Sequence, residues 1–290
     1  MSQSLSQPLP SQSLPAQPAH QDQAKGYPAF GVRRFGRVNW LGTWTLYVKE
    51  VRRFTKILSQ TVAAPVITTL LYLSIFSLSV GKLRPDIHGV PFIEFLSAGL
   101  IMMTMIQNAF TNTSSSLLIS KIQGNVVDLL MPPLSPGELN LGIAMAGVTR
   151  GVVVGVVTAI GMMPFVPLGM SHLWAIVFYA VGASLMMSLL GMLGGIWAEK
   201  FDHLQALTNF IILPATFLSG TFYSVTQLPA FAQSITHWNP IFYLIDGLRY
   251  GMTGHADGSI ATGVAVVIGC NMALWATTHY LFHTGYRLKA

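Results

Sequence analysis

The sequence predicts an all-α integral membrane protein with about six transmembrane helices. Of its 290 residues, 52% are hydrophobic and only 9% are charged, whereas soluble domains carry about 25% charged residues. The mean hydropathy is +0.55. Half of the 16 Lys and Arg residues fall between Lys25 and Lys56, just before the first long hydrophobic stretch. A net charge of +6 would suggest nucleic-acid binding in a soluble protein, but this placement indicates membrane topology instead, so no nucleic-acid partner is expected.

Residues 1–36 are predicted to form a disordered cytoplasmic tail. The first thirty residues are rich in Ser, Gln and Pro, and they lack the apolar core of a secretory signal. A segment of this composition cannot bury enough apolar surface to offset the entropy of folding.

Residues 38–58 are predicted to form an amphipathic helix ahead of the first span. At about 100° per residue, one face carries Trp40, Trp44, Tyr47, Val48, Val51, Phe54 and Leu58, and the other carries Lys49, Arg52, Arg53 and Lys56. A helix with aromatic residues on one side and cations on the other lies in the membrane interface. Two interpretations remain open, a lipid anchor alone or a helix that also contacts a cytoplasmic partner. Amphipathicity by itself favours the anchor.

Six uncharged stretches are candidates for transmembrane spans, since a spanning helix needs about 20 apolar residues. Between Lys56 and Lys82 lie 25 residues without charge, and between Glu94 and Lys121 lie 26. The 48 uncharged residues at 151–198 are too many for one crossing, so they are divided where Pro and Gly cluster. The predicted spans cover about residues 59–81, 95–118, 139–165, 172–198, 204–222 and 259–283.

A re-entrant helical hairpin is predicted at about residues 223–250. This segment is hydrophobic and aromatic, but prolines and the Asn239-Pro240 turn signal interrupt it. Two short helices that dip into the outer leaflet fit the pattern, and they should pack on the spans because irregular backbone at membrane depth must be buried in protein. The residues singled out here are Phe222, Tyr223, Pro229, Asn239, Pro240 and Arg249.

The charge distribution predicts that both termini are cytoplasmic. With six spans, twelve Lys and Arg residues fall in the inside segments and only Lys82, Arg84 and Arg249 in the outside segments. This is the bias that cytoplasmic loops of membrane proteins show. An odd number of spans would instead place Arg287 and Lys289 outside.

Arg150 is the only charged residue deep within a predicted span. An arginine there costs about 2.5–3.5 kcal/mol on insertion scales, so it should face the protein interior. It could contact an anionic substrate or a gating partner, or it could only bond polar groups of the second span. Gln107, Asn108 and Asn112 are available there. The sequence does not decide between these interpretations, and we take Gln107, Asn108 and Arg150 as candidate pathway or gating residues.

The loop between the second and third spans is more apolar than a plain connector. A short helix that ends before Pro132 would expose Leu129, Leu130 and Met131. Apolar residues rimmed by charge are typical of a docking surface. We call this segment the docking loop; it comprises Asp128, Leu129, Leu130, Met131, Pro132, Pro133, Ser135, Pro136 and Glu138, with Asp128 and Glu138 expected at its rim.

No sequence motif indicates a nucleotide, metal or catalytic site. The chain has no G-x-x-x-x-G-K-[ST] phosphate loop, because its one Gly-Lys pair, Gly81-Lys82, is not followed by Ser or Thr. It also lacks H-E-x-x-H and G-x-S-x-G. His279 and His283 are spaced as a pair but lack a third ligand, so interfacial side chains are the favoured interpretation. Cys270 is expected to be a reduced, buried thiol. We expect no metal, cofactor or catalytic residue on this chain.

Several segments together resemble a known family: Leu-Tyr-Val-Lys-Glu-Val-Arg-Arg-Phe at 46–54, which includes Glu50, Gly-Leu-Ile-Met-Met at 99–103, Asp-Leu-Leu-Met-Pro-Pro-Leu-Ser-Pro at 128–136, Phe-Tyr-Ser at 222–224, Trp-Asn-Pro at 238–240 and Gly-Leu-Arg-Tyr-Gly at 247–251. The chain resembles the type-2 permeases of bacterial ABC exporters, in particular the YadH-like inner-membrane permeases and, more distantly, the nodulation (NodJ-like) and drug-exporting permeases. The resemblance covers about residues 38–286.

The resemblance implies two six-helix permeases side by side in the bacterial inner membrane, with two copies of a cytoplasmic ATPase subunit that binds ATP and Mg. It implies that the helix at 38–58 lies against this ATPase, which makes docking the preferred interpretation of that helix. It also implies that the docking loop carries a coupling helix and that the segment at 222–250 is an outer re-entrant hairpin. Related permeases export glycolipids, polysaccharides, lipo-oligosaccharides or hydrophobic drugs, so the resemblance does not define the substrate.

Two small-residue runs bear on the second copy. They are Gly147, Gly151 and Gly155 in the third span and Gly191, Gly194 and Gly195 in the fourth. Small residues at this spacing let helices approach closely, either within one copy or between two copies, so the runs do not locate the dimer face.

A membrane-embedded lipid-modifying enzyme and a secondary transporter are the alternatives to a permease. The enzyme would need a polar catalytic cluster near one membrane face, and the sequence contains none that we can identify. The transporter would usually need acidic residues in the middle of the membrane, but Glu94 and Asp246 fall near the edges of a span and of the hairpin. The lack of such a polar cluster counts against the enzyme, and the lack of acidic residues in the middle of the membrane counts against the secondary transporter.

Overall fold

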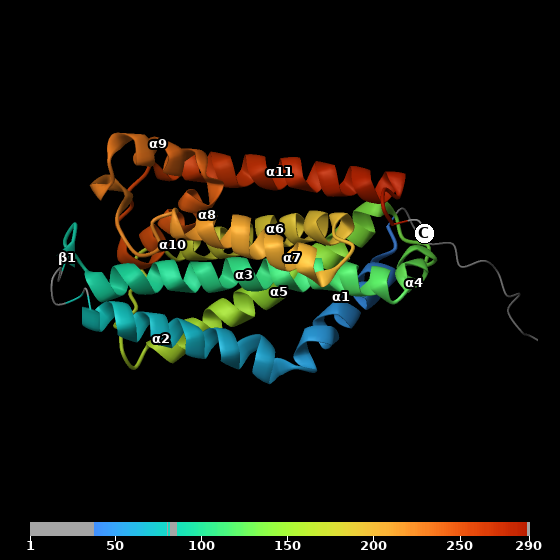
Figure 1. The fold of residues 1–290 in the computed structure, drawn as a ribbon, viewed down its shortest axis with the longest axis horizontal. Helices are drawn as coiled ribbons and strands as arrows, with labels where there is room; N and C mark the ends of the chain where they lie inside the picture. The colour runs from blue at the N-terminus through green and yellow to red at the C-terminus, as the bar shows by residue number, and fades with distance from the viewer. Residues whose placement is uncertain (1–37, 80, 82–85, 289–290) are drawn as a thin grey trace, which may run out of the picture. The chain divides into compact units, whose positions relative to one another are not determined.

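The computed structural model describes residues 38–79, 81 and 86–288. The predicted tail at 1–36 lies outside this range. Several cations that entered the charge count also lie outside it, namely Lys82, Arg84, Lys289 and those before residue 38. The described chain is helical except for one short β-hairpin and the connections (Figure 1). The elements are α1 (Trp40–Thr55), the π-helix η1 (Ser59–Ala63), α2 (Ala64–Ser79), β1 (Asp86–Ile87), β2 (Val90–Pro91), α3 (Phe92–Ile122), α4 (Val126–Leu130), α5 (Pro136–Met162), α6 (Leu173–Trp197), α7 (Phe201–Leu207), the π-helix η2 (Thr208–Ile212), α8 (Leu213–Phe217), the 3-10 helix η3 (Val225–Gln227), α9 (Ala230–Trp238), α10 (Pro240–Thr253) and α11 (Ile260–Thr284).

Five helical segments in the described part of the chain are long and apolar enough to cross a membrane. They are Ser59–Ser79, Phe92–Ile122, Pro136–Met162, Leu173–Trp197 and Ile260–Thr284. The prediction of an all-α membrane protein is therefore confirmed at this level. The segment expected to form a further span, residues 204–222, is instead a shorter run of α7, η2 and α8 that ends at Phe217. The turn that follows contains Gly220 in a left-handed backbone conformation (φ 75°), which glycine adopts without strain.

Helix α3 is the centre of the bundle and packs against α6, α5, α10 and α2. Most of its spanning window is buried inside the protein (83%), compared with 22% for α2 and 11% for α11. The outer helices α2 and α11 therefore present apolar side chains outward, which is stable only against lipid or another protein.

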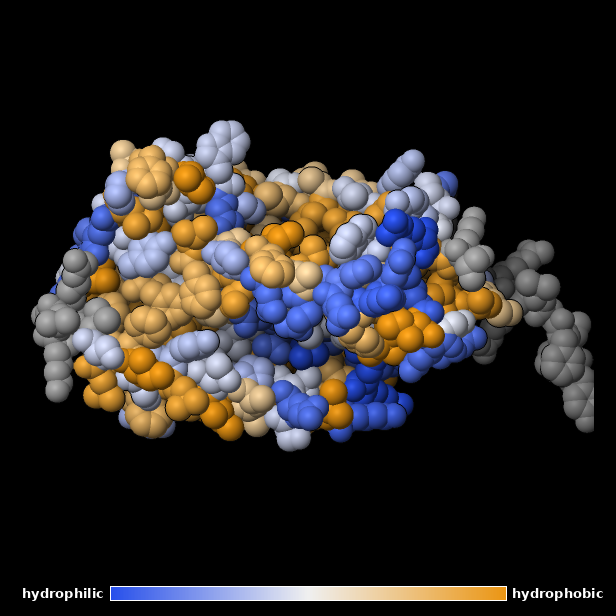
Figure 2. Space-filling model, viewed as in Figure 1, coloured by the Kyte–Doolittle hydropathy of each residue, from blue (hydrophilic) through white to orange (hydrophobic). Residues whose placement is uncertain are grey.

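The connections gather at two ends of the bundle (Figure 1). Helix α4 and the end of α11 lie at one end, which we call the α4 end, whereas β1 and α9 lie at the other, which we call the β1 end. On the face that Figure 2 shows, hydrophilic residues gather in the half toward the α4 end, and hydrophobic residues cover much of the half toward β1. The two ends of the bundle thus differ in polarity.

Glycines create the close contact between α3, α5 and α6. A Cβ on Gly151 would lie 2.6 Å from Ser184 Oγ, and one on Gly195 would lie 2.8 Å from the Ser114 carbonyl oxygen. A Cβ on Gly191 would collide with the carbonyl oxygen of Phe110. Both small-residue runs of the sequence therefore pack helices within one copy of the chain.

The substitution Gly191→Ala is expected to lower the stability of the bundle by about 1–3 kcal/mol, because backbone must move to admit the methyl group. The control is Gly269→Ala on α11, where an added Cβ meets nothing within 4 Å in the described structure. That variant should keep or slightly raise stability, since Ala favours helix by about 1 kcal/mol over Gly. Thermal unfolding of the purified proteins in detergent compares the two. Equal melting temperatures for Gly191→Ala and the wild type would contradict the packing argument.

Candidate functional site

The docking loop forms α4 and the start of α5 at the α4 end of the bundle. Asp128 is exposed, and Met131 is 76% exposed. The expectation that Leu129, Leu130 and Met131 are exposed together is wrong for Leu129, which is only 6% exposed, and Leu130 is half-buried. Both pack on the core because α4 turns that side of its helix toward a buried cluster to which α1, α3, α5, α6 and α11 contribute. The exposed apolar side of α4 is instead formed by Val127 and Met131.

Glu138 does not lie at the rim of the docking loop, contrary to expectation. Its carboxylate is buried and accepts hydrogen bonds from the backbone N–H groups of Asn39 (2.6 Å) and Ser135 (2.7 Å). Ser135 in turn caps the N-terminus of α5, with Pro136 at the first position. The sequence Ser-Pro-Gly-Glu at 135–138 fits the capping box, which was the signal for this arrangement. The cap fixes the docking loop to α5 and to the residue that precedes α1.

A second bond joins the same parts, because the Asn39 side chain donates to the Pro133 carbonyl oxygen (3.2 Å). Its oxygen also accepts from Gly42 N (2.9 Å) and so caps α1. The start of α1 and the docking loop therefore form one connected surface.

Helix α1 buries a stripe that overlaps only one edge of the predicted aromatic face. Its buried residues are Thr43, Leu46, Glu50 and Phe54, which share a stripe at helical spacing and face α5 and α3. Of the predicted face, Phe54 is buried in this stripe, whereas Trp40 and Trp44 are exposed. The cause is tertiary: the bundle selects a narrow stripe, whereas the sequence offered a wide apolar face. The exposed polar face retains Lys49 and Arg52.

The exposed aromatic residues of α1 flank a groove against α5. It has a volume of about 370 Å³ and is lined by Trp40, Thr43, Trp44, Tyr47, Leu141, Gly142 and Met145. The Tyr47 hydroxyl lies 2.9 Å from the Thr149 hydroxyl. Aromatic residues with one apolar and one polar side suit a membrane–water interface or a protein interface.

Arg53 also departs from the prediction, because it is not simply on the exposed cationic face. Its guanidinium donates to Glu50 (Nε–Oε2 3.1 Å) and to the Asn112 carbonyl oxygen (2.6 Å). Glu50 is buried and accepts from Ser116 Oγ (2.6 Å). This network connects α1 to the central helix α3, and a buried charge is stable only when it is paired in this way.

Arg150 contacts the second predicted span. Its side chain is buried in α5, and its guanidinium donates to Asn108 Oδ1 (3.1 Å). Gln107 and Asn108 line a groove of about 280 Å³ between α2 and α3, with polar neighbours that include Gln60, Thr69 and Thr104. Arg150 is not among the residues that line this groove. Gln107 and Asn108 therefore face one groove. Arg150 lies outside it and holds the Asn108 side chain by a hydrogen bond.

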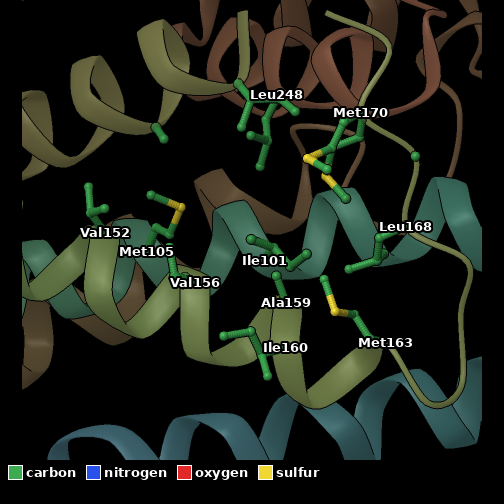
Figure 3. Close-up of a pocket in the computed structure, with 15 residues that line it drawn as sticks. Ile101, Met105, Val152, Val156, Ala159, Ile160, Met163, Leu168, Met170 and Leu248 are labelled. Atoms are coloured by element: carbon green, nitrogen blue, oxygen red, sulfur yellow. The ribbon is translucent and has the colours of Figure 1, made fainter. Parts of the chain in front are cut away.

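An apolar cavity of about 240 Å³ lies among α3, α5, α6 and α10 (Figure 3). Every residue that lines it is hydrophobic or glycine. Met105 and Ile101 come from α3, Val156 and Ile160 from α5, and Leu248 from α10. Met163, Leu168 and Met170 of the connection between α5 and α6 complete the wall. The sequence analysis missed this cavity, because no local pattern relates these four helices and this connection.

The segment at 223–250 contains two short helices, α9 and α10, on either side of Asn239-Pro240. Asn239 caps α10, and its amide donates to Ala215 O and Ser219 Oγ, both at 2.8 Å. Pro229 precedes α9. Helix α10 is buried, whereas α9 leaves Trp238 89% exposed. The hairpin thus packs on the bundle through α10 and leaves α9 outside.

Aromatic residues fix the start of this segment. Phe222 contacts the rings of Tyr72, Phe76 and Phe217, with centroid distances of 6.3, 4.6 and 5.2 Å. Tyr223 is half-buried and packs against Val225, Phe242 and Tyr243. These contacts join the hairpin to α2 and α8.

Arg249 is fully buried, although the charge count placed it in an outside segment. Its guanidinium carbon lies 3.6 Å from the centre of the Phe95 ring, and Nη2 donates to the Gly220 carbonyl oxygen (2.7 Å). Nη1 lies 4.0 Å from Asp246 Oδ1. As a cation held inside the protein, Arg249 says nothing about which side of the membrane faces the cytoplasm, and it should not be counted.

Comparison with known proteins identifies the family. The family model of the ABC-2 type transporter matches residues 42–253. The chain is 38% identical over 253 residues to "Inner membrane transport permease YadH" of Escherichia coli (strain K12), which covers 87% of this chain and 98% of that protein. It is 27% identical over 239 residues to "Nodulation protein J" of Rhizobium leguminosarum bv. viciae, covering 80% and 89%. Since the family model covers most of the chain and the first relative almost its whole length, this protein belongs to the ABC-2 type transporter family.

Proposed function

We propose that this chain is the membrane-spanning permease subunit of an ABC exporter in the bacterial inner membrane. The observation that carries the proposal is the full-length similarity to an inner membrane transport permease. The chain supplies no catalytic residue or cofactor site for ATP, and a separate cytoplasmic ATPase binds ATP and Mg and drives transport. The functional unit holds two copies of this chain and two copies of the ATPase.

The docking loop and α1 form the ATPase-binding surface in this proposal. Support comes from the exposed Val127 and Met131 beside the exposed acid Asp128. The bonds from Glu138 and Asn39 join this surface to α5. A force applied at the docking loop would reach α5 through the Ser135–Glu138 cap, because the loop continues directly into that helix.

Six crossings with both termini in the cytoplasm complete the topology. The run of α7, η2 and α8, which lies between α6 and α9 in the chain, provides the additional crossing. In this run α7 lies toward the α4 end and α8 toward the β1 end (Figure 1). The exposed cations Lys49 and Arg52 of α1 support a cytoplasmic location for the α4 end, because cytoplasmic segments carry an excess of Lys and Arg. The α9–α10 hairpin then dips into the outer leaflet.

The substrate has a hydrophobic part, as in a lipid-linked saccharide or a hydrophobic drug-like molecule. The apolar cavity among α3, α5, α6 and α10 supports this class, since its walls offer no hydrogen-bonding side chain. A free polysaccharide would need polar walls such as those of the groove beside Gln107 and Asn108.

Reconstitution tests the proposal. The chain is purified with the ABC ATPase that assembles with it and is placed in lipid nanodiscs. We expect the complex to hydrolyse ATP and to be stimulated by lipid-linked or hydrophobic compounds, and we expect the permease alone to bind no nucleotide, since it has no phosphate loop. Replacing the phosphate-loop lysine of the ATPase is the control and should abolish hydrolysis. Nucleotide binding by the isolated permease would contradict the proposal.

A further inference from the structure

Three side chains that can bind metals converge at the β1 end of the bundle. His88 lies in the turn between β1 and β2, and His255 and Asp257 lie in the connection between α10 and α11. One ligand atom of each residue lies within 4.8 Å of the others. His255 Nε2 is 3.4 Å from Asp257 Oδ1. Two ligands at about 2.0–2.1 Å from a tetrahedral Zn²⁺ are about 3.4 Å apart, so this pair already has the spacing of a metal site.

The hydrogen bonds of Asp257 point independently to a cation. Its side chain is only 1% exposed, and Oδ2 accepts from Ser224 Oγ (2.8 Å) and Val225 N (3.0 Å). Oδ1 and His255 Nε2 have no hydrogen-bond partner in the described structure, although both atoms are buried. A buried carboxylate oxygen without a donor is costly. A cation between Oδ1 and Nε2 would satisfy both atoms.

The surrounding contacts hold these ligands in place. The backbone N–H groups of Asp257 and Gly258 donate to the Asp246 carboxylate at 2.8 and 2.9 Å, which fixes the loop that carries Asp257. The rings of His88 and His255 are stacked with centroids 4.9 Å apart. Outer contacts of this kind orient metal ligands and tune their affinity.

His88 is held by the hairpin turn and by two hydroxyls. It has a positive φ of 52° and is followed by Gly89 at φ 79°, as a two-residue hairpin turn requires at both positions. Its Nε2 lies 3.0 Å from the Thr226 hydroxyl and 3.4 Å from the Ser224 hydroxyl. A metal bound through Nε2 would replace these contacts, whereas a metal bound through Nδ1 would keep them as orienting contacts.

We propose that His88, His255 and Asp257 form a binding site for a divalent transition-metal ion, with Zn²⁺ as the best match to two imidazoles and one carboxylate. The fourth position is open to water. The ion connects the turn before α3 to the connection before α11, and it thereby links two connections that are distant in sequence. The site does not depend on the proposed transport function.

Metal titration tests the site. The full chain is purified in detergent with an affinity tag that contains no histidine, stripped with a chelator and titrated with Zn²⁺ by calorimetry. We expect one ion per chain, a rise in melting temperature on binding, and the visible absorption of tetrahedral coordination when Co²⁺ is used. His255→Gln and His88→Gln should each weaken binding at least about 100-fold, because even changes outside the ligand set cost about 10–100-fold.

A matched control uses the other pair of histidines. His279→Gln with His283→Gln, near the opposite end of α11, should leave Zn²⁺ binding unchanged. His88 is exposed, so its variant tests the site even if Asp257→Asn fails to fold through loss of the bonds to Ser224 and Val225. The proposal is overturned if the wild type binds no Zn²⁺, which would leave only an ion pair of His255 with Asp257. It is also overturned if the control lowers affinity as much as the site variants do.

Discussion

Replacing Met131 with Asp is expected to weaken binding of the ATPase subunit by at least about 2 kcal/mol, the cost of losing an interface hot spot, and to abolish transport. Met131 is the most exposed apolar residue of the docking loop, at 76%. A carboxylate at this position would lose the apolar contact and would be desolvated without a partner. Folding should be unaffected, since Met131 follows α4 and does not belong to the buried cluster there. Subunit affinity measured in nanodiscs, together with the melting temperature, checks both expectations.

Met170→Asp is the matched control for subunit affinity. Met170 is exposed to a similar degree but belongs to the connection between α5 and α6, where it lines the apolar cavity, so this control reports on subunit affinity and not on transport. Its replacement should leave ATPase binding unchanged. Leu129→Asp is the contrasting variant, because Leu129 is packed in the core and its replacement should lower the melting temperature. If Met131→Asp assembles with the ATPase and exports normally, the docking loop is a plain connector.

The choice of Met131 shows where the sequence was sufficient and where it was not. An apolar segment with three prolines predicts a docking surface, but Leu129, Leu130 and Met131 are consecutive and a helix must turn at least one of them inward. Which one turns inward depends on the buried cluster that α1, α3, α5, α6 and α11 form beside α4. Sequence alone therefore does not distinguish Leu130 from Met131 as the position to replace, whereas the structure makes Met131 the cleaner one because it is the more exposed.

The broad fold could be predicted because lipid imposes a simple rule on composition. Long uncharged stretches predict helices, and α2, α3, α5, α6 and α11 lie in the stretches that were assigned to spans. The stretch at 204–222 shows the limit, because its helical run ends at Phe217, before a turn that contains the left-handed Gly220. The remaining run of α7, η2 and α8 is too short to be identified as a span from its length and composition.

The polar sites could not be predicted because they join distant residues. In the sequence, the helices from α3 to α10 lie between His88 and the pair His255 and Asp257, so no spacing motif relates the three residues. Arg249 was interpreted as an outside cation, since the sequence contains no signal that Phe95 and Gly220 would enclose it. The Glu138 cap was an exception, because the capping box is a local pattern.

Arg249→Met is expected to destabilise the bundle by about 3–5 kcal/mol, because it leaves the buried Asp246 without a cation. The Asp246 side chain is 4% exposed and would keep only the backbone donors of Asp257 and Gly258. The variant also loses the contact with Phe95 and the bond to the Gly220 carbonyl oxygen. Thermal and denaturant unfolding of the protein in detergent measure the loss.

Two further variants separate the charge from the packing. Arg52→Met removes an exposed cation from α1 and should leave the melting temperature unchanged. Arg249→Met combined with Asp246→Asn removes both charges and should recover part of the lost stability, because the double variant no longer buries an unpaired carboxylate. The single variant breaks the connection between α3, α10 and the turn at Gly220, whereas the double variant restores only the electrostatic balance. If Arg249→Met unfolds at the wild-type temperature, Asp246 does not need its cation, and the cluster around Phe95 is held by packing alone.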